Sequence, residues 1–119
     1  MEVQVFGTKK SQDTRKALRF FGERRIKAHF VDLKERAASR GELIRFAQKF
    51  GTTALIDLSS ARYRALGLAA TRYSDERWLD QLCDEPLILR QPLVRCGPRL
   101  TIGLAEREWL HWVDEAKAK

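Results

Sequence analysis

The stretch Val3–Leu18, VQVFGTKKSQDTRKAL, contains the signals of a strand, a short loop and a helix in immediate succession. Val3 and Val5 alternate with polar residues, which is the two-residue period of a strand with one buried face. From Asp13 to about Glu23, apolar residues recur at helical spacing and basic residues occupy the opposite face. A strand that runs through a short loop into a helix predicts the start of an α/β domain.

Ser11 stands at the expected start of this helix, and Thr14 follows three residues later. Serine is a favoured N-cap, because its side-chain oxygen accepts a hydrogen bond from the first helical turn, a contact worth about 1 kcal/mol. A cysteine in the same place would form a thiolate stabilised by the helix N-terminus, whereas the hydroxyls of Ser11 and Thr14 are very weak acids. A serine nucleophile needs an adjacent general base, and neither His29 nor His111 has a sequence context that places it beside Ser11. We therefore expect Ser11 to cap the helix.

Further strand and helix signals follow along the chain. Ser39 and Glu42 form the S-x-x-E pattern of a capping box, and the helix that they begin is expected to stop at Gly51. A hairpin is expected near the end of the sequence, with Cys96 in its turn beside Gly97. The remaining expected elements are a strand over 28–32, a short helix over 61–66, a helix after Ser74, and a final helix from about Ala105 in which Trp112 is exposed.

Length and composition predict a single domain. The chain has 119 residues, of which 44% are hydrophobic, enough for one modest core. No run approaches the ~18 apolar residues of a membrane helix, and the first residues include no apolar stretch of the signal-peptide type. We therefore expect a cytoplasmic protein that does not contact a membrane. Cys83 and Cys96 are too few for a disulfide framework or a zinc site, and neither a metal nor a cofactor is expected.

The net charge of +7 is concentrated in two segments. Residues 1–27 hold eight basic residues against three acidic ones, and residues 87–103 hold three arginines and no acid, whereas residues 28–86 are neutral. This distribution favours an acidic protein surface or a small anion as the partner. Nucleic acid is a weaker alternative because no recognition motif accompanies the charge. A solvated helix face with scattered arginines would give the same pattern.

Several segments, taken in order, resemble the arsenate-reductase-like (ArsC) family, which also contains the redox regulator Spx. FGTKKSQDTRKAL at residues 6–18 is similar to the family's Y-G-x-K-x-C-x-T-C-R-K-A apart from the cysteines. The match continues through ALI at 54–56, YRALGL at 63–68, LILRQPLV at 87–94 and RLTIG at 99–103. The resemblance implies an α/β protein with a thioredoxin-like fold, a small mixed sheet with flanking helices. The thioredoxin-like parts are expected at about 1–35 and 86–119, with a helical insert over about 36–85.

The site that the resemblance implies is degenerate in this sequence. Ser11 stands where arsenate-reducing members have their nucleophilic cysteine, and Gln91 stands where they have an oxyanion-binding arginine before the proline. Pro92 is similar to the cis proline that thioredoxin-like folds place opposite the first helix. Arg90 is displaced from the arginine position by one residue, which turns its side chain to the opposite face of an extended segment. We expect a degenerate site at Ser11, Thr14, Gln91 and Pro92, with no catalytic residue there.

Three functions remain open from the sequence. The first is a redox-inactive, Spx-like binding or regulatory protein, whose contact is centred where the two basic segments meet at one end of the sheet. The second is a displaced thiol–disulfide or glutathione-dependent oxidoreductase that uses Cys96, whose neighbours Arg95 and Arg99 favour a thiolate. The third is a basic protein that binds anions or nucleic acid. The residues expected to bind the partner or anion are Lys10, Ser11, Gln12, Arg15, Arg90, Arg95 and Arg99.

Overall fold

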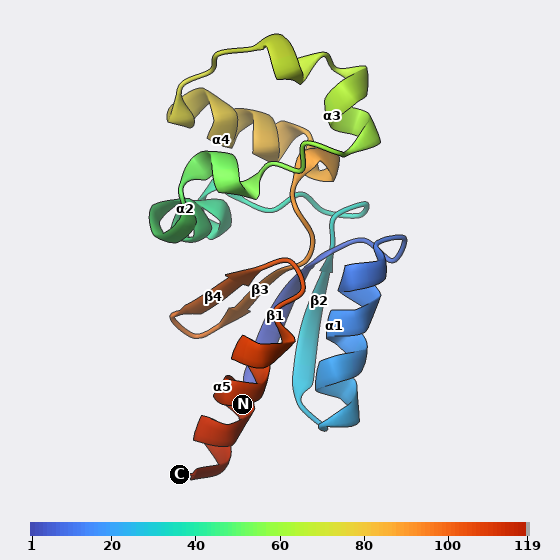
Figure 1. The fold of residues 1–119 in the computed structure, drawn as a ribbon, viewed down its shortest axis with the longest axis vertical. Coiled ribbons are helices and arrows are strands. Elements are labelled where there is room, and N and C mark those ends of the chain that lie inside the picture. Colours follow the sequence, from blue (N-terminus) through green and yellow to red (C-terminus); the bar gives the residue numbers. More distant parts are fainter. Residues whose placement is uncertain (119) are drawn as a thin grey trace. The chain divides into compact units, whose positions relative to one another are not determined.

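The computed structural model describes residues 1–118, and its chain divides into two compact units (Figure 1). The first, which we call the sheet unit, consists of Met1–Val31 together with Gln91–Lys119. The second, which we call the insert unit, is the continuous segment Asp32–Arg90. The sheet unit is thus assembled from two separate stretches of the chain. No helix over residues 1–118 is long and apolar enough to cross a bilayer.

Four strands and two helices form the sheet unit. They are β1 (Glu2–Gly7), α1 (Gln12–Glu23), β2 (Lys27–Asp32), β3 (Leu93–Cys96), β4 (Arg99–Ile102) and α5 (Glu106–Ala118). The strands lie in the order β2-β1-β3-β4 and form a mixed sheet. β1 pairs antiparallel with β3, so that Phe6 lies opposite Leu93, and β3 pairs antiparallel with β4 across a tight hairpin. This arrangement confirms the predicted thioredoxin-like sheet with flanking helices.

Helices α1 and α5 pack against each other within the core of the sheet unit. Phe20 and Phe21 of α1 lie against Trp109 of α5, with ring centroids 5.6 and 5.3 Å from that of the indole. The expectation that Trp112 is exposed is wrong, because this side chain is buried in the same core. Trp109, Trp112 and Val113 are spaced three and four residues apart, so they share one face of the helix.

The predicted helix starts are confirmed at Ser11, Ser39 and Ser74. Each serine is an N-cap whose side-chain oxygen accepts a hydrogen bond from the backbone N–H three residues later. Ser39 also completes a capping box with Glu42, and the helix that it begins ends before Gly51, which has a φ of 90°. These helix starts could be predicted from the sequence because each capping hydrogen bond joins residues only three positions apart.

The insert unit is helical. Its elements are α2 (Arg40–Phe50), α3 (Ala61–Ala65) and α4 (Asp75–Asp84), with 3-10 turns at Thr52–Leu55, Leu68–Ala70 and Pro86–Ile88. Its buried side chains include Leu43, Phe46, Leu79, Leu82 and Ile88. Arg40 of α2 forms ion pairs with Glu76 and Asp80 of α4, and Arg62 forms a two-pronged ion pair with Glu85 at 2.8 and 2.9 Å.

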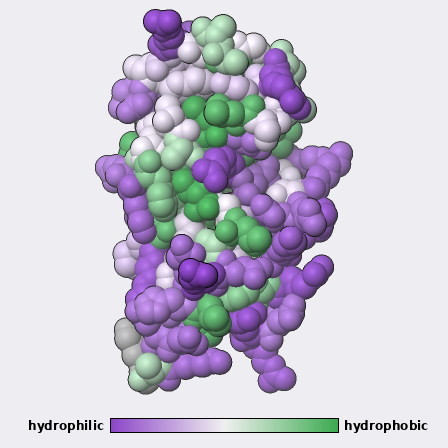
Figure 2. Space-filling model, viewed as in Figure 1, coloured by the Kyte–Doolittle hydropathy of each residue, from purple (hydrophilic) through white to green (hydrophobic). Residues whose placement is uncertain are grey.

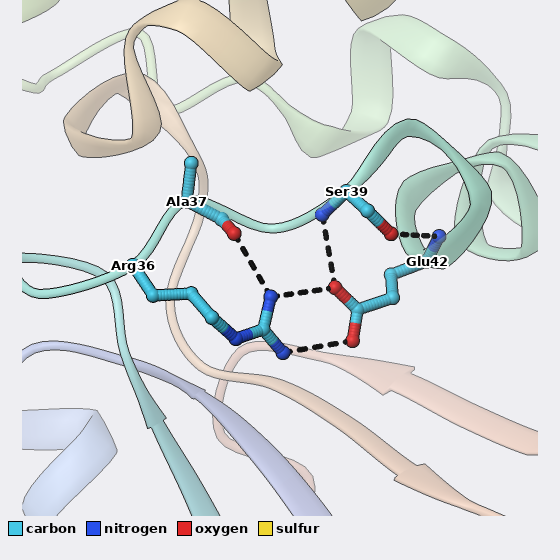
Figure 3. A network of polar contacts seen from close by, with 4 residues as sticks. All are labelled: Arg36, Ala37, Ser39 and Glu42. Atoms are coloured by element: carbon cyan, nitrogen blue, oxygen red, sulfur yellow. Dashed lines mark hydrogen bonds and ion pairs between the residues drawn. The ribbon is translucent and has the colours of Figure 1, made fainter.

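A third arginine, Arg36, stabilises the start of α2 through Glu42 (Figure 3). The two guanidinium nitrogens of Arg36 each donate to one carboxylate oxygen of Glu42 at 3.0 Å, and the backbone N–H of Ser39 donates to the same carboxylate at 2.9 Å. The hydrogen bonds from Arg36 are the main reason why the pKa of Glu42 falls from its ordinary 4.5 to about 2. The ionised carboxylate is therefore stabilised by folding.

Replacing Glu42 by glutamine should lower the free energy of unfolding by about 1–2 kcal/mol at pH 7, a value kept modest because Arg36 is half exposed. Because the pKa of Glu42 is lower in the folded state, its carboxylate stabilises the folded protein at pH values above the unfolded pKa of about 4.5. This contribution disappears as the pH falls toward 2. Urea unfolding at pH 7 and pH 3 should therefore show a difference between Glu42→Gln and the wild type that shrinks at pH 3. Glu35→Gln, at an exposed neighbouring glutamate, is the matched control. A difference that is independent of pH would contradict the assignment.

Candidate functional site

The loop between β1 and α1 presents Ser11 at the N-terminus of the helix. The backbone N–H of Ser11 donates to the carbonyl of Thr8 at 3.1 Å, which closes the loop. The Ser11 hydroxyl oxygen accepts from the backbone N–H of Thr14 at 3.2 Å, and the Ser11 backbone is extended, with φ −76° and ψ 120°. The side chain thus performs the capping function predicted from the sequence.

Gln91 connects the proline loop to this same region. Its side-chain carbonyl oxygen accepts three hydrogen bonds: from the backbone N–H of Thr8 at 2.7 Å, from the Thr8 hydroxyl at 3.0 Å and from the Thr14 hydroxyl at 3.4 Å. Both threonines are buried. The peptide bond between Gln91 and Pro92 is cis, as the resemblance implies. We call the set Thr8, Thr14 and Gln91 the Gln91 clamp.

Gly7 allows the close packing on which the Gln91 clamp depends. A Cβ atom at Gly7 would lie 2.3 Å from the hydroxyl oxygen of Thr14 and 2.7 Å from its methyl carbon. No side chain fits at these separations, so the end of β1 and the first turn of α1 approach each other through glycine. The clamp therefore rests on the close packing of the Thr14 side chain against the Gly7 backbone as well as on its own hydrogen bonds.

Four polar or charged side chains surround Ser11. Lys9, Lys10, Gln12 and Arg15 are all exposed. Arg15 folds back over the loop, and its guanidinium donates to the carbonyl of Lys9 at 2.6 Å. The partial positive charge of the α1 N-terminus adds to that of these cations. The structure therefore brings together the predicted site residues that belong to the first basic segment.

The second basic segment, residues 87–103, was expected to meet this loop at one end of the sheet. Arg95 of that segment lies away from the loop. Leu93 pairs with Phe6 near the end of β1 that leads to Ser11, whereas Arg95 pairs with Gln4. Because the strands are antiparallel, each step along β3 moves the chain about 3.3 Å toward the start of β1. The expectation that both basic segments meet at one end of the sheet is therefore wrong for Arg95.

The two other arginines expected at the site are engaged elsewhere. Arg99 pairs with Cys96 across the β3–β4 hairpin, one step further from the β1–α1 loop, and its guanidinium forms an ion pair with Glu115 of α5. Arg90 belongs to the insert unit, where its guanidinium donates to the carbonyl of Ala54 at 3.4 Å. Within the sheet unit, the positive charge beside Ser11 thus comes from the first basic segment, residues 1–27.

Neither cysteine lies in an exposed turn. Cys96 is the last residue of β3 and is partly buried against the core of the sheet unit, because the hairpin turn is confined to Gly97 and Pro98. It lines a shallow pocket of about 280 Å³ together with Arg99 and Trp112. Burial raises the pKa of the Cys83 thiol in α4. Over residues 1–118, no group of three or more His, Cys, Asp or Glu side chains is placed to hold a metal ion.

Sequence reasoning found the positions of Thr14 and Gln91 but missed what they do together. It assigned no role to Thr8, which belongs to the Gln91 clamp, or to Gly7, which packs against Thr14. The one available signal was the Gly-Thr pair directly after the first strand, since glycine at a strand end often marks a close backbone approach. Nothing in the local sequence indicates that a glutamine 83 residues after Thr8 accepts its N–H.

The sheet order, the helix that begins directly after β1 and the neighbouring cis proline define a thioredoxin-like protein with a helical insert. Residues 6–112 match the ArsC family, and the chain belongs to this family. Among solved structures, it is similar to the YFFB (PA3664) protein, with 17% identity and a TM-score of 0.83 over 92% of this chain and 96% of the other. It is also similar to an arsenate reductase from Vibrio cholerae, with 22% identity and a TM-score of 0.80 over 93% and 97% of the two chains. Both likenesses concern the fold. The curated proteins give no significant match.

Proposed function

We propose that this ArsC-family protein is a redox-inactive member that acts as a binding or regulatory module without the usual thiol chemistry. The observation that supports this most directly is the Gln91 clamp. Three donors beside the start of α1 are bound by the oxygen of a neutral amide, Gln91, and the Ser11 hydroxyl oxygen caps the helix. Donors that a bound oxyanion would need are in this way used for the protein's own structure.

The chemistry of the hydroxyl group leads to the same proposal. Reduction of arsenate by a thiol takes two electrons from sulfur and leaves a disulfide. Ser11 has no sulfur to oxidise, and Thr14 offers only a second hydroxyl. The two thiols of the chain are poorly suited to replace a nucleophilic thiol at the position of Ser11. Cys96 is partly buried in the sheet-unit core, and the pKa of Cys83 is raised.

The charge of this surface alone makes a small anion or an acidic protein segment a suitable partner. Lys10, Gln12 and Arg15 are exposed around Ser11, and α1 directs its N-terminus to the same place. Cationic side chains beside a helix N-terminus attract negative charge without any covalent step. A member that has lost the thiol step can keep this attraction, which is the sense in which we propose a binding module.

The proposal is tested by assaying arsenate reduction with either glutathione or thioredoxin as the reductant, with an active arsenate reductase as the positive control. We expect no turnover above the background given by the reductants alone. The Cys83→Ser/Cys96→Ser variant should behave identically. Robust turnover that persists in this variant would contradict the proposal, because it would mean that the protein catalyses electron transfer from the reductant's thiols to arsenate without any thiol of its own. Turnover abolished by Cys96→Ser alone would instead establish the displaced-thiol function.

A further inference from the structure

The exposed face of α1 and the turns at its two ends are rich in basic side chains. Arg15 and Arg19 are both exposed and lie four residues apart, so they stand on one face of the helix about 6 Å from each other along its axis. Lys16 adjoins them on the next position of the helix. We call this set the α1 cationic face, and it comprises Lys9, Lys10, Arg15, Lys16, Arg19 and Arg25.

The charges of this face are not neutralised by ion pairs. Within residues 1–118, no salt bridge includes any of its six side chains, whereas Arg36, Arg40 and Arg62 of the insert unit are each paired with carboxylates. Lys16 and Arg19 of this face line a hollow of about 300 Å³ together with two acids, Glu23 and Glu106, and neither acid forms an ion pair with them. The six cations of the α1 cationic face are therefore available to a partner.

The face has no apolar anchor. The large hydrophobic side chains that are exposed all lie outside residues 9–27, and the surface over α1 is mainly hydrophilic in the view of Figure 2. Protein partners obtain most of their binding energy from buried aromatic and apolar side chains at the centre of the interface. Contacts to a phosphate backbone need only charged and polar donors, and such interfaces are more positive than those between proteins. The composition of this face thus favours nucleic acid over an acidic protein.

We propose that the α1 cationic face binds the phosphate backbone of double-stranded DNA without reading its sequence. The twelve residues of α1 extend about 18 Å, a length over which a duplex presents on the order of ten negative charges. Binding of this kind needs no base-reading motif, which the chain does not have. The proposal goes beyond the redox-inactive binding module and does not depend on the chemistry of Ser11, so the arsenate assay and the DNA experiment can fail separately.

The first measurement is the fluorescence anisotropy of a labelled duplex of about 20 base pairs and arbitrary sequence, titrated with the full chain at several salt concentrations. With about five phosphate contacts, the affinity should fall roughly 500-fold between about 50 and 200 mM salt. A second arbitrary sequence should bind equally well. Absence of saturable binding at about 50 mM salt and about 100 μM protein would overturn the proposal.

Matched charge reversals then locate the surface. Arg15→Glu/Arg19→Glu should weaken binding at least about 30-fold and reduce the salt slope by about 2. Arg45→Glu/Arg72→Glu changes the net charge equally at two exposed arginines of the insert unit, and should cost less than about threefold. Arg15→Lys/Arg19→Lys keeps the charge and should keep the affinity within about threefold, while circular dichroism checks that all variants fold. Equal weakening by the two reversals would overturn the proposal, and so would competition by polyglutamate as effective as that by unlabelled duplex.

Discussion

Replacing Gln91 by leucine should destabilise the protein by about 2–4 kcal/mol, because it leaves buried donors without an acceptor. The backbone N–H and hydroxyl of Thr8 and the hydroxyl of Thr14 all donate to the Gln91 side-chain oxygen. Thr14 is fully buried and Thr8 is 4% exposed, so water cannot replace the lost partner without structural change. Urea unfolding, followed by tryptophan fluorescence and circular dichroism, gives the free energy.

Two further variants distinguish the contribution of the hydrogen bonds from that of the shape of the Gln91 side chain. Gln91→Glu keeps an acceptor oxygen at the same position and should cost less than about 1 kcal/mol. Thr14→Val removes only the longest of the three hydrogen bonds, at 3.4 Å, and should cost about 1 kcal/mol. Equal destabilisation by Gln91→Leu and Gln91→Glu would mean that the shape of the side chain, not its oxygen, holds the loop to α1.

Replacing Ser11 by cysteine should give a thiol whose pKa lies below about 7.5, compared with about 8.5 for a free cysteine. The position is the N-cap of α1, and Lys10 and Arg15 are exposed nearby, so both the helix and the cations favour a thiolate. Thiolate absorbance is measured against pH, with the wild-type protein supplying the baseline from Cys83 and Cys96. Arg19→Cys, at an exposed position inside the same helix, is the control and should titrate near 8.5.

The Ser11→Cys variant should nevertheless reduce arsenate no faster than the wild type. A nucleophile alone leaves the oxyanion without a cation at the position of Gln91, whose oxygen already accepts three hydrogen bonds. Titration of Ser11→Cys at the same pH as Arg19→Cys would show that the helix N-terminus does not act on this residue. Efficient turnover by the variant would show that the site lacks nothing but the thiol.

The parts of the fold that were predictable from the sequence are those encoded by neighbouring residues. Ser11, Ser39 and Ser74 begin helices because a hydroxyl oxygen caps the backbone three residues away, a pattern visible in the sequence itself. Gly97 marks a hairpin turn because its φ of 59° suits glycine. The resemblance to a family supplied the order in which these elements assemble.

The parts that could not be predicted depend on pairing between distant segments. The register of β1 against β3 decides that Arg95 lies beside Gln4 and not beside Ser11, and no residue near Arg95 encodes that choice. Cys96 was expected in the turn, but the strand extends through it because Arg99 is its partner across the hairpin. The Gln91 clamp could not be predicted either, because Gln91 is distant in the sequence from Thr8 and Thr14 and meets them only in the folded chain.

The division of the sheet unit between the two ends of the chain affects its synthesis. Phe20 and Phe21 emerge from the ribosome with α1, but Trp109, which packs against both, is made almost ninety residues later. At usual elongation rates this interval lasts about 4–18 s. The insert unit is continuous, so its own ion pairs and apolar contacts can form in the meantime. On a nascent chain, the side of α1 that carries Phe20 and Phe21 therefore stays uncovered by Trp109 until α5 is translated.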